Sequence, residues 1–215
     1  MTIIAFDIET CPTEEAALSS SQKARLEQQL DYHRERSPDA AADALSRKAR
    51  SLHPFLGWIC CISAVMGPLG GDPGAPRSLT AETPDDEAEL LDAFWSGIGR
   101  VDKPVIWASF NGKRFDAPYI AARSAGHGIT PTRQDILNTY PYKQRSHADL
   151  SNLWPQPYRI NDLCDLLGID TPKTEMDGSQ VAGAVADGRI NEVASYCEGD
   201  ARATFRCLQA VSYVL

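Results

Sequence analysis

Two acidic side chains interrupt an apolar, strand-forming run at the start of the chain. The run spans residues 2–10 and reads TIIAFDIET, with Asp7 and Glu9 two positions apart. Side chains alternate across a strand, so both carboxylates point to one face. Apolar residues cover both faces of the run, as in a central strand, where unpaired anions are costly. A shared proton, a basic partner or a divalent cation would offset the cost of burying the two charges. Alternatively, this end of the strand is open to solvent, where the charges cost nothing.

Two further acids are placed where they could join this pair. Asp116 follows the strand predicted over Pro104–Phe110, and Asp200 lies on the long helix predicted over Arg189–Tyr213. Asp200 shares the apolar stripe of that helix with Tyr196, one turn earlier, so both should face the core. A half-buried acid near an arginine would explain Asp200 alone.

Four carboxylates that converge repel one another, and divalent cations are the natural counter-charge. Mg²⁺ and Mn²⁺ prefer oxygen ligands, and two such ions about 3.5 to 4 Å apart can activate water and stabilise the leaving oxygen of a phosphodiester. The sequence holds no P-loop, no dinucleotide-binding fingerprint and no nucleophilic Ser or Cys constellation. Metal-assisted hydrolysis is therefore the chemistry that these residues favour.

The elements that must position these side chains predict an α/β fold in a single domain, residues 1–215. Apolar runs at Leu56–Met66 and Pro104–Phe110 predict strands, and Arg77–Thr80 predicts a strand that returns after a Gly- and Pro-rich turn. Capping residues and helical periodicity predict helices that begin at Thr83 and that span Phe115–Gly126, Asn161–Leu167, Ser179–Ala186 and Arg189–Tyr213. Residues 130–154 predict no clear element. The pattern indicates a sheet with helices on its faces.

Residues 13–53 form a polar segment rich in helix-forming residues, with Pro38 as its one break. This composition predicts a helical insertion of two helices between the first and second strands. A solvated helical hairpin is the simplest interpretation, and a flap over the site is the alternative. Such a flap could touch phosphates through five basic residues, Arg34, Arg36, Arg47, Lys48 and Arg50.

The composition is that of an ordinary globular protein, with a formal net charge of −8. The molecule as a whole does not attract phosphate polymers, so a nucleic acid would have to meet local basic patches or bound cations. Neither a signal peptide nor a membrane segment is indicated, which leads us to expect a cytoplasmic location. The six cysteines show no C-x-x-C pair and predict buried free thiols.

Three short motifs resemble, in their order, the three exonuclease motifs of the DEDD superfamily. They are FDIET at residues 6–10, NGKRFD at residues 111–116 and YCEGD at residues 196–200. The resemblance is to the proofreading exonuclease domain of family B DNA polymerases and its stand-alone bacterial relatives. It implies a ribonuclease H-like mixed sheet flanked by helices, with a helical insertion after the first strand, and metal-dependent removal of nucleotides from a 3′ end.

The resemblance also implies a role for each matching residue. Asp7 would bridge two ions of Mg²⁺ or Mn²⁺, Glu9 and Asp200 would hold the ion that activates water, and Asp116 would support the second ion, partly through water. Tyr196 stands four residues before Asp200, which matches the tyrosine subgroup; the histidine subgroup has His one position earlier, where this chain has a serine. A phenol stays protonated near neutral pH, so Tyr196 would orient the attacking water as a donor.

Further residues are candidates for contact with the substrate. By the same resemblance Asn111 would contact the terminal nucleotide, while Phe115 would pack against a base or sit in the core. Asp149, in the sequence HADL, resembles a recurrent Asp-Leu element of these relatives, with a structural hydrogen-bonding role as the alternative. Phosphate contact or surface solubility would explain four basic residues, Lys113, Arg114, Lys143 and Arg145.

These inferences predict a 3′-5′ exonuclease that acts on single-stranded nucleic acid. Unpaired ends cost least to thread into a closed pocket, and DNA is favoured over RNA through the resemblance alone. A catalytically silent nucleic-acid-binding module and a phosphodiesterase for short oligonucleotides are the alternatives. No polymerase domain follows the third motif within these 215 residues, and the insertion has no counterpart in the resemblance, so the sequence identifies no protein partner.

Overall fold

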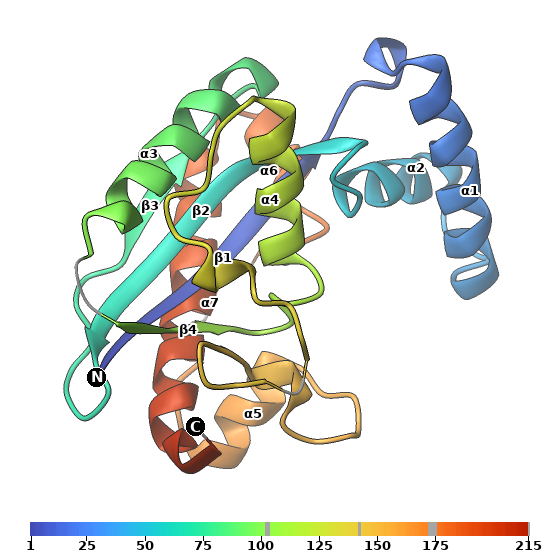
Figure 1. Cartoon of the computed structure of the whole chain (residues 1–215). Helices are drawn as coiled ribbons and strands as arrows, with labels where there is room; N and C mark the ends of the chain where they lie inside the picture. The colour runs from blue at the N-terminus through green and yellow to red at the C-terminus, as the bar shows by residue number, and fades with distance from the viewer. Residues whose placement is uncertain (102–103, 142, 172–175, 215) are drawn as a thin grey trace.

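A five-stranded mixed sheet forms the centre of the computed structural model, which describes residues 1–101, 104–141, 143–171 and 176–214 (Figure 1). The strands are β1 (Thr2–Pro12), β2 (Gly57–Pro68), β3 (Arg77–Thr80), β4 (Val105–Ser109) and β5 (His147–Asp149). Their order is β3-β2-β1-β4-β5. β2 is antiparallel to β1 and β3, whereas β4 is parallel to β1 and β5. The predicted mixed sheet and the central place of the first strand are confirmed.

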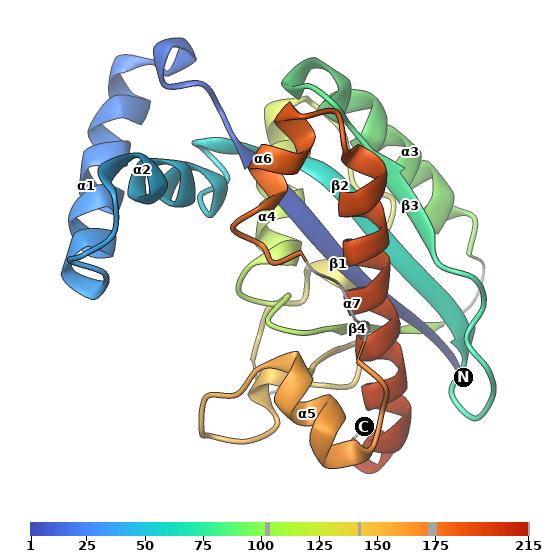
Figure 2. The ribbon, with the colours of Figure 1, turned by 180° about the vertical axis from the view of Figure 1, so that it is seen from behind.

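Helices cover both faces of this sheet. α3 (Glu87–Gly99) and α4 (Asp116–Gly126) lie on one face, and α7 (Ile190–Ala210) crosses the other (Figures 1 and 2). α6 (Val181–Ala186) precedes α7 in the sequence, and α5 (Ile160–Leu167) packs against α7. Short 3₁₀ turns occupy Glu15–Ala17, Pro84–Asp86, Asp135–Leu137, Leu150–Asn152 and Ser212–Val214.

The alternation of side chains along β1 divides the core between the two faces. Ile4, Phe6 and Ile8 are buried with residues of α3 and α4. Ile3 and Ala5 are buried with Ala201, Phe205 and other residues of α7. Asp7 and Glu9 continue the second set, so they point toward the α7 side. Full burial of each large apolar side chain contributes about 1.5 to 3 kcal/mol, which fixes the register of β1.

The predicted insertion after the first strand consists of α1 (Ser20–Arg36) and α2 (Ala42–Ser51), and Pro38 lies between them. Ser19 and Gln22 form a capping box at the start of α1. The two helices enclose a small core of their own, formed by Leu18, Leu26, Leu30, Leu45, Ala49 and Leu56. They project to one side of the sheet in both views (Figures 1 and 2), as expected for a solvated hairpin.

Two details of the chain differ from the prediction. The sequence predicted no strand within residues 130–154, yet His147–Asp149 forms β5 at the edge of the sheet. The last helix ends at Ala210 instead of Tyr213, because the chain turns into a 3₁₀ helix at Ser212. All six cysteines are buried and free, as predicted. None of the helices in the described ranges has the length and apolar character needed to cross a bilayer.

Candidate active site

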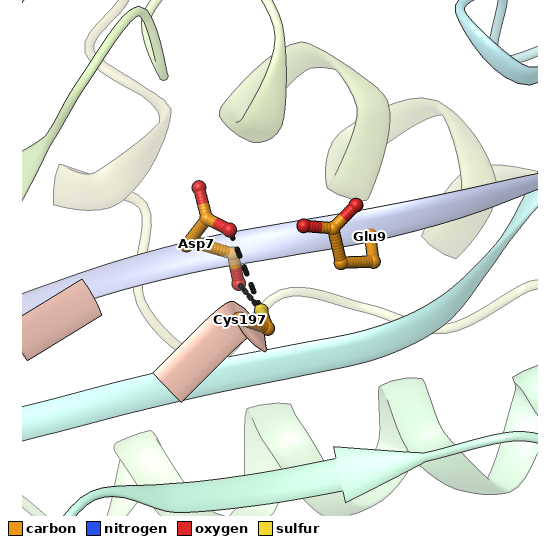
Figure 3. A group of neighbouring side chains, drawn as sticks. All are labelled: Asp7, Glu9 and Cys197. Atoms are coloured by element: carbon orange, nitrogen blue, oxygen red, sulfur yellow. Dashed lines mark hydrogen bonds between the residues drawn. The ribbon is translucent and has the colours of Figure 1, made fainter. Parts of the chain in front are cut away.

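Asp7 and Glu9 lie side by side on β1, and Cys197 of α7 lies against them (Figure 3). The ligand-forming atoms of these three side chains are all within 4.8 Å of one another. The Cys197 thiol lies 3.4 Å from both the backbone oxygen and the Oδ2 atom of Asp7, and donates to them. The sequence predicted the carboxylate pair, but it did not assign a place in the site to Cys197.

Asp116 joins this pair from the first turn of α4. Its Oδ1 atom accepts a hydrogen bond of 3.1 Å from the backbone N–H of Ile8, between the two acidic residues. Pairing between β1 and β4 ends at Ala5 and Ala108, so this N–H lies beyond the ladder and needs another acceptor. The amino end of a helix also favours a carboxylate.

Asp200 and Tyr196 approach from α7, on the face that the helical stripe predicted. The Tyr196 hydroxyl donates to the Asp200 carboxylate, which opposes the larger effect of burial on the pKa of Asp200. The net result is that the pKa of Asp200 is raised. The pKa of Tyr196 is raised as well, through burial and then the charges of Asp200, Glu9 and Asp7, so this phenol stays protonated.

The four acids lie close enough for their charges to affect one another. Burial raises the pKa of Asp7 well above its usual range, and the charges of Asp116, Glu9 and Asp200 raise it further. Burial and then the charge of Asp200 raise the pKa of Glu9, and burial raises the pKa of Asp116 to about 7. Among the described residues, no Lys or Arg forms an ion pair with any of these four carboxylates.

The residues of this site fit a divalent cation. Asp7 and Glu9 offer oxygen ligands at short range, and the cluster carries excess negative charge that the described side chains do not neutralise. Carboxylate oxygens are the ligands that Mg²⁺ and Mn²⁺ prefer, whereas a thiol such as Cys197 suits softer metals. Asp116 and Asp200 stand outside the 4.8 Å group, so their contribution is electrostatic in this structure.

A tight turn after β4 holds the second motif. Asn111 adopts a left-handed backbone (φ 67°), and its exposed side chain lies at the surface. Gly112 leaves no room for a side chain, because an added Cβ would lie 2.4 Å from Ser109. The buried Asp149 carboxylate accepts from the backbone N–H of Asn111 at 2.8 Å and from that of Lys113 at 3.0 Å. The structural hydrogen-bonding interpretation of Asp149 is the one that this geometry favours.

The other residues predicted to contact the substrate differ in their burial. Phe115 is partly buried, and its ring packs at 5.4 Å from that of Tyr119. Lys113 is 2 % exposed and its Nζ atom donates to the backbone oxygens of Tyr140 and Lys143, so both the phosphate and the surface interpretation were wrong. Arg50 of the insertion is also buried and donates to backbone oxygens, which removes it from a phosphate-binding flap. Exposed side chains are retained by Arg114, Lys143 and Arg145.

A cavity of about 560 Å³ lies against a different face of α7. Its lining includes Ser195, Gly199, Arg202 and Arg206 of α7 together with residues 169–171, and none of the four carboxylates. These α7 positions recur at helical spacing on the side away from the core stripe. The carboxylates occupy the junction of β1, α4 and α7 instead.

Comparisons with known proteins identify a family and a fold. Residues 57–211 match a family described as "Predicted 3′-5′ exonuclease related to the exonuclease domain of PolB", a range that begins after Asp7 and Glu9. No curated protein matches. The structure is similar to that of a family B DNA polymerase from the hyperthermophilic archaeon Pyrobaculum calidifontis, with a TM-score of 0.66 and 17 % identity over 98 % of this chain and 24 % of the polymerase. A structure of exonuclease I is similar with a TM-score of 0.45 and 14 % identity, over 93 % of this chain and 42 % of that one.

The family match and the fold lead to one conclusion. The matched range covers most of the chain, and the mixed sheet with its flanking helices is shared with the polymerase structure, of which this chain spans about a quarter. The predicted ribonuclease H-like fold is therefore confirmed. The chain belongs to the family of predicted 3′-5′ exonucleases related to the exonuclease domain of PolB.

Proposed function

We propose that this protein removes nucleotides one at a time from the 3′ end of single-stranded nucleic acid, with DNA preferred to RNA. The observation that carries the proposal is the group of four electrostatically coupled acids, Asp7, Glu9, Asp116 and Asp200, without a basic partner among the described residues. Such a group needs divalent cations to hold its charge at neutral pH. Residues 1–215 would act as one exonuclease domain with the insertion at its side.

The four acids would hold two ions, Mg²⁺ or Mn²⁺. Asp7 would be shared between them, Glu9 and Asp200 would hold the ion that binds the attacking water, and Asp116 would support the other. When bound, such ions lower the pKa of water and neutralise charge on the leaving oxygen. Asp7 is the acid on which the charges of the other three all act, which supports its shared role.

Tyr196 would orient the attacking water. Its hydroxyl lies near Asp200 on the same helix, and its raised pKa keeps the proton on the ring oxygen. A protonated phenol beside three carboxylates can donate to a water or to a phosphate oxygen, but it cannot act as a strong base. The alignment of the nucleophile would thus depend on the pairing of two residues one helical turn apart.

Residues of the second motif would also position the 3′-terminal nucleotide. Asn111 presents an exposed amide from a turn that Gly112 and Asp149 hold rigidly, so it could read the terminal nucleotide. Phe115, whose ring packs against that of Tyr119, would contact the same nucleotide. The net charge of −8 predicts modest non-specific affinity for the rest of the polymer.

The test is the time course of a 5′-labelled single strand, as DNA and as RNA, with Mg²⁺, with Mn²⁺ and with a chelator. We expect a ladder that shortens from the 3′ end only with metal, and faster for DNA. A blunt duplex and a 3′-phosphorylated strand serve as matched poor substrates. Intact strands with both metals would reject the hydrolase and leave a binding module, and equal rates on a dinucleotide and a 20-mer would indicate a phosphodiesterase for short oligonucleotides.

A further inference from the structure

Three aromatic rings form a chain that begins at the second motif and ends at the surface. Phe110 immediately precedes Asn111, and its ring centroid lies 5.7 Å from that of Tyr158 in a T-shaped arrangement. The ring of Tyr158 lies in turn 5.7 Å from that of Trp154. Trp154 is 39 % exposed, while the other two rings are partly buried. We call these three residues the aromatic cluster.

The aromatic cluster lies on the same face of the sheet as the carboxylates. In β4, Ile106 and Ala108 pack with Ile3 and Ala5 on the α7 side, and Phe110 continues that alternation. Pairing of β1 with β4 ends at Ala5 and Ala108, and Phe110 and Tyr158 both pack against the buried group that contains Ala5. Asp7 follows Ala5 by two residues and points to the same face of β1, so the cluster starts on the carboxylate side of the sheet.

The cluster is also held rigid. Trp154 and Tyr158 are separated by the sequence Pro-Gln-Pro, and each proline fixes its own backbone φ. The Tyr158 hydroxyl donates to the backbone oxygen of Leu150, which fixes the ring between its two neighbours. An exposed tryptophan on a rigid segment loses little conformational freedom when it makes a contact.

We propose that the aromatic cluster is a stacking platform for the bases that precede the 3′-terminal nucleotide. Bases of every kind present a π-face, and stacking on a fixed aromatic ring binds a single strand without sequence preference. The proposal rests on the proposed function, because it assumes that the strand ends at the carboxylates. Exposed Arg159, next to Tyr158, is placed to meet the backbone of the same strand.

Binding can be tested without turnover. The other three tryptophans, Trp58, Trp95 and Trp107, are 4 %, 1 % and 0 % exposed, so intrinsic fluorescence reports surface contact mainly through Trp154. We expect an oligo-dT 12-mer in the presence of chelator to quench the fluorescence of the wild-type protein. Trp154→Phe should bind with similar affinity but without the quench, whereas Trp154→Ala should bind about fivefold to a hundredfold more weakly.

Kinetics then separate strand contact from a structural effect. With Mg²⁺, Trp154→Ala should raise the KM for the 12-mer and leave the hydrolysis of a dinucleotide unchanged, because the dinucleotide is too short to reach the cluster. Tyr213→Ala, which removes an exposed ring beyond the end of α7, is the matched control and should change neither. Unchanged 12-mer affinity in Trp154→Ala, or equal losses on both substrates, would overturn the platform.

The proposed function and the platform fail in distinguishable ways. If the wild-type protein hydrolyses no substrate with either metal, the exonuclease proposal fails, while quenching in chelator still measures the platform. If hydrolysis proceeds but the 12-mer neither quenches Trp154 nor depends on it, the exonuclease proposal stands and the strand leaves the carboxylates by another route.

Discussion

The Asp116 carboxylate accepts the backbone N–H of Ile8 at 3.1 Å, although 108 positions separate the two residues in the sequence. This bond connects the first turn of α4 to β1 at the point between Asp7 and Glu9. It therefore sets the distance between the second motif and the first without the help of a metal. A shift of α4 would alter the position of Asp116 and the local course of β1 together.

Replacement of Asp7 tests the metal site directly. We expect Asp7→Asn and Asp200→Ala to reduce the rate of hydrolysis by at least about a thousandfold, because each removes a charged oxygen ligand. The fold should persist, since loss of a repelled, buried carboxylate relieves the metal-free protein. Single-turnover rates with Mg²⁺ and circular dichroism measure the two effects. Asp72→Asn, at an exposed acid, should behave as wild type; near-normal rates in Asp7→Asn would refute the metal-ligand role.

Tyr196→Phe should have a smaller effect than loss of a carboxylate. The variant keeps the ring in place but removes the hydroxyl that donates to Asp200, so we expect kcat to fall about tenfold to a hundredfold with little change in KM. Steady-state kinetics on a single-stranded 12-mer provide the measurement. The exposed Tyr213→Phe is the comparison. An unaltered kcat would show that Tyr196 does not orient the water.

The metal-free protein should become less stable as pH rises, through Asp116. Burial raises the pKa of Asp116 from 3.8 to about 7, so the folded state binds this proton more tightly than the unfolded state. The resulting stability is complete below pH 4 and is lost as pH rises through 7, by at most about 4 kcal/mol. Asp116→Asn should be closest to wild type at pH 4 and exceed it at pH 8 in urea unfolding with chelator.

Asp116 and His147 change the stability of the folded protein in opposite directions as pH rises, so wild type has to be compared with Asp116→Asn. Burial lowers the pKa of His147 to about 4, so its contribution is present above about 6.5 and is lost as pH falls, the reverse of the Asp116 effect. Only the difference between Asp116→Asn and wild type isolates the carboxylate. Mn²⁺ at pH 8 should then stabilise wild type more than the variant. A difference that does not grow with pH would contradict the assignment.

Asp149→Asn should loosen the turn that presents Asn111. Asp149 uses both carboxylate oxygens as acceptors, and an amide would turn its NH₂ group toward one of the backbone donors. We expect a loss of about 2 kcal/mol in the free energy of unfolding, with a higher KM. Thermal melts and kinetics would show both. The surface variant Asp165→Asn should show neither, and an unchanged KM would separate the turn from substrate binding.

Period and composition were sufficient to predict most of the frame. β1, β2 and β4 were predictable because each combines an apolar run with adjacent turn residues, and α7 because its buried stripe spans five turns. β5 was not, since three residues of mixed character carry no period and depend on pairing with β4 for their conformation. Short edge strands are defined by their neighbours and not by their own sequence.

The site shows the same division. Asp7 and Glu9 were predictable because two charges in an apolar strand conflict with burial, and a conflict of this kind marks function. Cys197 was not, because a thiol on a buried stripe agrees with a core position. Lys113 was misplaced for the opposite reason: a lysine in a turn suggests solvent, and only the two carbonyls that surround its Nζ atom reveal that it is buried.

The two ends of the insertion meet at the base of a β-hairpin. The Thr13 N–H donates to the Leu56 carbonyl at 3.0 Å, directly after Pro12 pairs with Gly57. The forty-odd residues between them are thus an enlarged hairpin loop with a small core of its own. Evolution or design could lengthen, exchange or delete such a loop while the pairing of β1 with β2 continued to hold the catalytic strand in register. The insertion, which can change without disturbing the sheet, is thereby connected directly to β1, whose register the site requires.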